Sequence, residues 1–111
     1  MFLAGMGASE LSALLANYKF EQCTEFTITN ADLLSAEIGK VLKLGFAGSA
    51  REEFRQTSGL AAPIRDANSK TIAALSIWNV GGSDLVDTLS LHLEAVRGAA
   101  ASIQTSFGQI D

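Results

Sequence analysis

The sequence is poor in the residues on which several common chemistries depend. A single cysteine, Cys23, excludes an internal disulfide and any zinc site built on cysteine pairs. The only histidine, His92, has no cysteine, aspartate or second histidine at metal-ligand spacing, so we expect a half-exposed helix residue rather than a ligand. Neither a G-x-S-x-G elbow before a helix nor a phosphate-binding glycine loop is present.

Catalysis by a nucleophile also requires a base and an orienting group that converge on it. The adjacent carboxylates Glu52 and Glu53 are a poor acid/base pair, because neighbouring residues on a strand point to opposite faces. We therefore expect no enzyme activity and no cofactor.

Charge and long apolar runs are scarce as well. Charged residues make up 18% of the chain, the net charge is −4, and the eight lysines and arginines are scattered singly. Without a basic stripe, direct nucleic-acid binding by this chain is not expected. No stretch approaches the roughly 20 apolar residues of a membrane span, and the N-terminus lacks the charged region of a signal peptide. We expect a cytoplasmic protein.

Apolar residues, in contrast, are abundant. They form 48% of the 111 residues, which is enough for the core of one small domain. The proportion is slightly higher than a free-standing domain needs, which indicates that part of the apolar surface faces a partner. We expect the chain to form a homo-oligomer.

Apolar periodicity predicts three helices, at about 9–18, 31–44 and 84–107. Thr29 followed by Asp32 resembles a capping box for the second helix, and Gly45 suits its end because glycine tolerates the left-handed conformation. Ser83 is a suitable N-cap for the third helix. The apolar stripe of the second helix is expected to consist of Leu34, Ile38, Val41 and Leu42.

Three strands are predicted between the second and third helices. One begins within 45–50, and two more, at 59–65 and 71–79, flank the turn sequence Asp-Ala-Asn-Ser at 66–69. An antiparallel hairpin and an α+β fold with flanking helices follow. Pro63 requires an edge position, a bulge or a backbone nitrogen that faces no neighbour.

The predicted hairpin has one face of very small residues, among them Gly59 and Ala61. On the second arm, Ala73, Leu75 and Ile77 alternate with a set that includes Ser76 and Trp78. Small side chains leave room for a ligand or, equally well, for a closely packed helix.

Several short motifs follow one another along the chain: Phe-Leu-Ala-Gly at 2–5, Phe-Thr-Ile-Thr-Asn at 26–30, Gly-Phe-Ala at 45–47, Glu-Glu-Phe at 52–54, Ala-Ala-Pro-Ile-Arg-Asp at 61–66 and Ala-Ala-Leu-Ser-Ile at 73–77. In this order they resemble the effector-binding domain of the isocitrate-lyase-regulator (IclR) family of transcription factors. The resemblance implies a GAF-like fold that is incomplete here. Residues 1–111 would be the C-terminal part of the effector domain, and the winged helix-turn-helix would be absent.

The resemblance also implies a function and a site. Family members bind a small-molecule effector, an organic acid or an aromatic metabolite, and thereby change operator binding. The positions that match the family's pocket, together with the neighbouring strand face, are Ser49, Ser58, Gly59, Ser76 and Trp78. The family often has an aspartate near the position of Ser49, a cysteine where Gly59 stands, and a serine where Trp78 stands.

These departures leave less charge and one large aromatic ring at the predicted site. They favour a flatter and less polar ligand than a small keto acid. Two alternatives stay open at this point. Trp78 could be an ordinary core residue that fills a former pocket, and the domain could be a structural oligomerisation module without a ligand.

Overall fold

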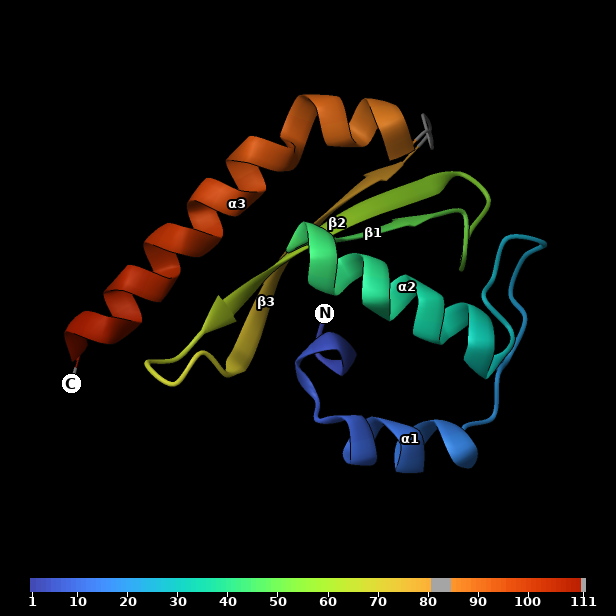
Figure 1. The fold of residues 1–111 in the computed structure, drawn as a ribbon. Coiled ribbons are helices and arrows are strands. Elements are labelled where there is room, and N and C mark those ends of the chain that lie inside the picture. Colours follow the sequence, from blue (N-terminus) through green and yellow to red (C-terminus); the bar gives the residue numbers. More distant parts are fainter. Residues whose placement is uncertain (81–84, 111) are drawn as a thin grey trace.

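The computed structural model describes residues 1–80 and 85–110, so the predicted cap Ser83 lies outside the described residues. Three strands form one antiparallel sheet in the order β1-β2-β3, and helices lie on both of its faces (Figure 1). The fold is α+β, as predicted. The elements are a 3-10 turn η1 (Leu3–Gly5), α1 (Ala8–Ala16), α2 (Ala31–Leu44), β1 (Ala47–Ala50), β2 (Thr57–Arg65), β3 (Thr71–Val80) and α3 (Leu85–Ile110).

Helix α2 has the predicted bounds but a different N-cap. The side chain of Asn30, not that of Thr29, accepts a hydrogen bond from the backbone N–H of Leu33 at 2.8 Å. At the other end Gly45 adopts φ 80°, and its N–H donates to the carbonyl of Val41 at 2.8 Å. The prediction for Gly45 is confirmed, because only a residue without a Cβ takes this conformation at little cost.

The β2–β3 hairpin is also confirmed, with its turn where the sequence indicated. Asp66 holds the turn together, since its carboxylate accepts from the N–H groups of Asn68 and Lys70 at 2.8 and 3.0 Å. Ser69 takes up the left-handed conformation at φ 64°. Pro63 lies on β2, one strand away from the edge, yet β1 pairs only with residues 58–61, so no strand of the described chain faces Pro63 on that side.

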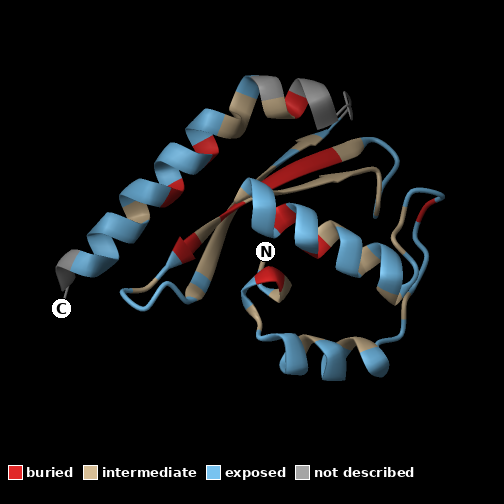
Figure 2. Ribbon diagram, in the orientation of Figure 1, coloured by how far each residue is buried: buried red, intermediate tan, exposed pale blue. Residues whose placement is uncertain are grey.

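Helix α3 covers one face of the sheet and forms the larger core with it. Leu60, Ala62 and Ile64 of β2 are buried, as are Val96 and Ala100 of α3 (Figure 2). Partly buried side chains complete this layer. They are the alternating set predicted for β3, Ala73, Leu75 and Ile77, together with Ile103 of α3.

A second, smaller core lies where η1 and α2 meet β1. Ala4, Ile38 and Val41 are buried, and Ala47 of β1 packs against them. The prediction that Leu42 belongs to the buried stripe of α2 is wrong, because its side chain is 64% exposed. The stripe is narrower than the sequence suggested, since α2 packs at the margin of the sheet.

Candidate functional site

Four of the five predicted site residues share one face of the sheet. The strand register places Ser49, Gly59 and Trp78 in one row across the three strands, and Ser76 in the adjacent row, opposite Ala61. Ala62 and Ile64 of β2 pack against α3, so Gly59 and Ala61, at the alternate positions of β2, point to the other face. The period-two argument therefore predicted correctly that Gly59, Ser76 and Trp78 share a face, and Ser49, which was included because of the family resemblance, joins them.

Ser58 does not join them. It is completely buried on the α3 side of the sheet, where its hydroxyl lies 2.7 Å from the hydroxyl of Thr88. Gly59 and Ser58 are adjacent on β2, and adjacent strand residues cannot face the same side. Ser58 is thus part of the contact between β2 and α3.

The indole of Trp78 lies directly on Gly59. A Cβ atom built on Gly59 would lie 2.7 to 2.9 Å from three atoms of the indole ring, which is closer than real Cβ contacts. The side chain of Trp78 is nevertheless 60% exposed, so one side of the ring rests on the strand and much of the rest is open. The alternative that Trp78 is an ordinary core residue is therefore wrong.

A carboxylate that the sequence analysis missed lies at the end of this row. The hydroxyl of Ser49 donates a hydrogen bond to Oε2 of Glu52 at 2.6 Å. We expected Glu52 and Glu53 on a strand, but β1 ends at Ala50, and Arg51 turns the chain with φ 62°. Nothing in the sequence marks this turn, because arginine has no preference for the left-handed region.

Two threonines from a distant segment hold the turn that carries Glu52. The hydroxyl of Thr24 donates to the backbone carbonyl of Arg51, and the hydroxyl of Thr27 donates to that of Glu52. The guanidinium of Arg51 also lies 5.3 Å from the ring centroid of Phe26, within cation–π range. The segments 23–27 and 51–55 are thereby fastened to each other at the end of β1.

A surface ion pair connects the same two segments. Nε of Arg55 donates to Oε2 of Glu25 at 3.0 Å, with both side chains more than half exposed. The pKa of Glu25 lies below its ordinary value, first because the carboxylate accepts a hydrogen bond from its own backbone N–H and then because Arg55 is near. Exposure limits what this pair adds to stability.

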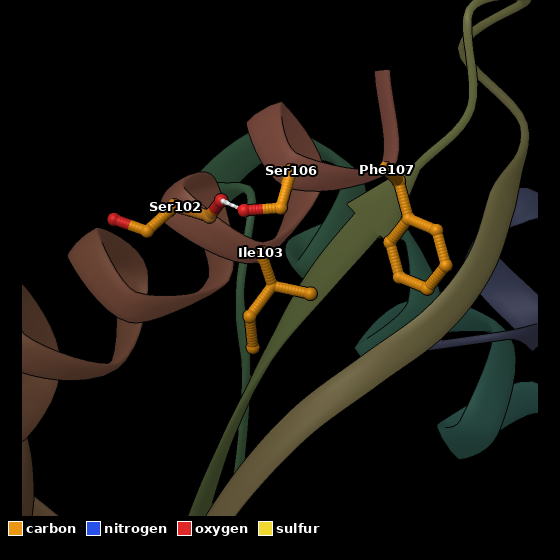
Figure 3. A pocket seen from close by; sticks show the side chains of 4 residues that line it. All are labelled: Ser102, Ile103, Ser106 and Phe107. Atoms are coloured by element: carbon orange, nitrogen blue, oxygen red, sulfur yellow. Dashed lines mark hydrogen bonds between the residues drawn. The ribbon is translucent and has the colours of Figure 1, made fainter. Parts of the chain in front are cut away.

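Several hollows of the described chain are not lined by Ser49, Gly59, Ser76 or Trp78. One of about 260 Å³ is lined by Ser102, Ile103, Ser106 and Phe107, near the C-terminal end of α3 (Figure 3). The hydroxyl of Ser106 is occupied there, since it donates to the carbonyl of Ser102 at 3.1 Å. No ionisable side chain lines this hollow, and it offers a charged ligand little.

The described residues contain no group of three or more His, Cys, Asp or Glu side chains arranged to hold a metal ion. No helix in the same part of the chain is long and apolar enough to cross a membrane. His92 is half-buried on α3, and Cys23 is exposed as a free thiol.

With this geometry in view, the chain can be compared with known proteins. Residues 1–105 match the family model described as the bacterial transcriptional regulator IclR C-terminal domain. The chain therefore belongs to the IclR family, in which this domain is the effector-binding part of a transcriptional regulator and not an enzyme.

Individual proteins that this chain resembles are also transcriptional regulators. The chain is 29% identical over 77 residues to the Escherichia coli K12 transcriptional regulator XynR, a match that covers 69% of this chain and 31% of XynR. A transcriptional regulator from Rhodococcus sp. RHA1 has a similar structure, with a TM-score of 0.90, 30% identity, and coverage of 97% of this chain and 44% of that one.

The inducer-binding domain of the Acinetobacter transcription factor PobR, solved as a double mutant with 3-hydroxybenzoic acid, shares the fold. Its TM-score is 0.82 at 20% identity, with 92% of this chain and 59% of that one covered. This chain thus spans less than two thirds of each of these three relatives.

Proposed function

We propose that this chain senses a small organic effector, an organic acid or an aromatic metabolite, on the sheet face that carries Ser49, Gly59, Ser76 and Trp78. Residues 1–111 would form the C-terminal part of the sensor domain. The effector would modulate operator binding by a DNA-binding domain that lies outside these residues. The observation that carries the proposal is the indole of Trp78, laid flat on Gly59 and 60% exposed, with two serine hydroxyl groups on the same face.

Each of these residues has a part in the proposal. An exposed ring lets a planar ligand stack on it, and aromatic contacts of this kind contribute about 0.5–1.5 kcal/mol beyond the buried area. The hydroxyl group of Ser76 can donate or accept a hydrogen bond, whereas that of Ser49 donates to Glu52 and can accept one from the ligand, so the two can orient the ligand. The PobR inducer-binding domain, which has the same fold, was solved with an aromatic acid.

A ligand screen by thermal unfolding tests the proposal. An effector that binds only the folded chain stabilises it by about 2.7 kcal/mol at a concentration 100 times its dissociation constant. We expect at least one small organic acid or aromatic compound to raise the melting temperature. The rise should be lost in Trp78→Ser and kept in Leu91→Ser, a matched change at a residue of α3 that is 73% exposed.

A ligand response that is equal in the two variants would place the site elsewhere. No response to a broad panel of such compounds, with the chain folded, would count against effector binding by these residues.

A second function, self-association, is favoured by the outer edge of β3. The sheet order leaves one edge of this strand without a neighbour among the described residues. All ten residues from Thr71 to Val80 are uncharged and none is proline, so the edge lacks the charges and the proline that often prevent strand pairing. Val80 at its end is 74% exposed.

Sedimentation equilibrium at tens of micromolar, a range set by ordinary interface strengths, tests this second function. We expect a dimer that weakens in Val80→Lys, because a lysine at the edge opposes pairing with another strand. Leu91→Lys, with the same charge on α3, should leave the dimer intact. A monomer at this concentration, or equal effects of the two lysines, would contradict pairing through β3.

A further inference from the structure

The face that carries Trp78 ends in a carboxylate. Glu52 is half-buried, and its Oε2 accepts a hydrogen bond from the hydroxyl of Ser49 at an oxygen–oxygen distance of 2.6 Å. Ser49 stands in the same cross-strand row as Gly59 and Trp78. One carboxylate oxygen of Glu52 is thus connected, through a single hydroxyl, to the row on which the indole lies.

The position of this carboxylate is fixed from two directions. The backbone carbonyl of Glu52 accepts a hydrogen bond from the hydroxyl of Thr27, and its carboxylate accepts one from the hydroxyl of Ser49. The preceding residue is held as well, by the hydroxyl of Thr24 on its carbonyl. A charged group that is positioned in this way acts on a ligand without first losing side-chain freedom.

The dimensions suit one aromatic ring and one substituent. Neighbouring strands lie about 4.8 Å apart, so the Cα atoms of Ser49 and Trp78, two strands apart, are separated by about 10 Å. The indole reaches inward over Gly59 and occupies part of that span. A ring stacked on the indole would therefore direct a substituent one or two atoms long toward Ser49 and Glu52.

We infer that Glu52 is a specificity-determining residue of this face, and that the preferred effector is a planar aromatic compound bearing a hydrogen-bond donor or a cationic group in place of a carboxylate. The inference rests on the proposed effector site. A carboxylate is an acceptor only, and it repels a second negative charge at short range. It attracts an ammonium group, and it accepts from a hydroxyl group.

Three probes of nearly equal shape test the preference. They are 3-hydroxybenzoate, 3-hydroxybenzyl alcohol and 3-hydroxybenzylamine, which differ mainly in the charge of one substituent. Trp78 is the single tryptophan of the chain, so its fluorescence reports stacking on the ring directly. A hydrogen bond to a charged group changes affinity by roughly tenfold or more. We expect the amine to bind at least about tenfold more tightly than the acid.

Glu52→Gln removes the charge and keeps the size of the side chain, so the ratio of the two affinities should fall close to one. Glu53→Gln is the matched control, because its carboxylate is adjacent in sequence but exposed. The wild-type ratio should survive in that variant.

The outcomes separate this inference from the proposed function. A ratio that is the same in wild type and Glu52→Gln, or a wild-type preference for the acid, overturns the role of Glu52 and leaves effector binding intact. If none of the three probes changes the fluorescence of Trp78, the inference is overturned, and the wider thermal screen decides the proposed function separately.

Discussion

The contact between Gly59 and Trp78 leads to a prediction about stability. Gly59→Ala should destabilise the wild-type chain but stabilise a Trp78→Ser variant. A Cβ on Gly59 would lie 2.7 Å from the indole, so Gly59→Ala must displace the ring or separate the strands. The backbone itself does not require glycine, because Gly59 is outside the left-handed region that Gly45 occupies. The cost of Gly59→Ala should therefore come from Trp78 alone.

The structure sets the size of the effect. About two fifths of the Trp78 side chain is covered, which corresponds to roughly 100 Å² of a side chain that can bury up to about 250 Å². At about 25 cal/mol/Å², this burial contributes at most about 2.5 kcal/mol. Gly59→Ala should lower the free energy of unfolding by about 1–2.5 kcal/mol, depending on how much of this contact is lost.

The Trp78→Ser variant has no indole ring for a Cβ atom on residue 59 to meet. Alanine is then better than glycine in a strand by about 0.5–1 kcal/mol, because glycine loses more backbone freedom on folding. The same substitution at Gly59 should thus stabilise the variant, and the two sites should couple by about 1.5–3.5 kcal/mol, in the upper part of the range for residues in contact.

Urea unfolding followed by circular dichroism measures all four proteins of this cycle, since fluorescence is lost with Trp78. In the single variant Gly59→Ala, a red shift of tryptophan emission should accompany the loss of stability, because the ring moves into water. If Gly59→Ala has the same effect in both backgrounds, the indole does not rest on Gly59, and the geometry proposed for the effector face falls with it.

Three further predictions concern the fold and its partners. Asn30→Ala should lower the free energy of unfolding by about 1 kcal/mol in a urea titration, because the Leu33 N–H loses its capping acceptor, whereas Thr29→Ala should be near neutral. Ser58→Ala should cost about 1 kcal/mol by removing a partner of the buried Thr88 hydroxyl, and Ser58→Ala combined with Thr88→Val should cost less than the sum of the single changes. A gel shift at moderate salt should show no sequence-specific DNA binding by this chain, since its net charge is −4, and tight specific binding would refute that expectation.

The elements of the fold follow closely from local patterns. The threes-and-fours spacing of apolar residues predicted α2 with its exact bounds, and Gly45 predicted its end. The turn chemistry of Asp66 and its neighbours predicted the hairpin, because a carboxylate that accepts two nearby N–H groups is a property of a few consecutive residues. Such features need no information from distant parts of the chain.

The candidate site was predictable only in part. Strict alternation along a strand places Ser76 and Trp78 on one face, and the hairpin register then brings Gly59 beside them. The family resemblance groups Ser58 with these residues, but the same alternation assigns it to the other face. There its hydroxyl is hydrogen-bonded to the hydroxyl of Thr88. The error came from giving position in a motif more weight than the period of the strand.

What the sequence determined by itself, then, is the order and type of the elements, the face on which each strand residue lies, and the family to which the chain belongs, because these depend on local periodicity and short motifs. What only the tertiary structure decided is how far each face is covered. The exposure of Trp78, the exposure of Leu42 and the contact of Ser49 with Glu52 depend on where α2 and the turn after β1 come to rest. Those placements result from contacts between segments far apart in the chain, such as the hydroxyl of Thr27 on the carbonyl of Glu52, for which no local pattern exists.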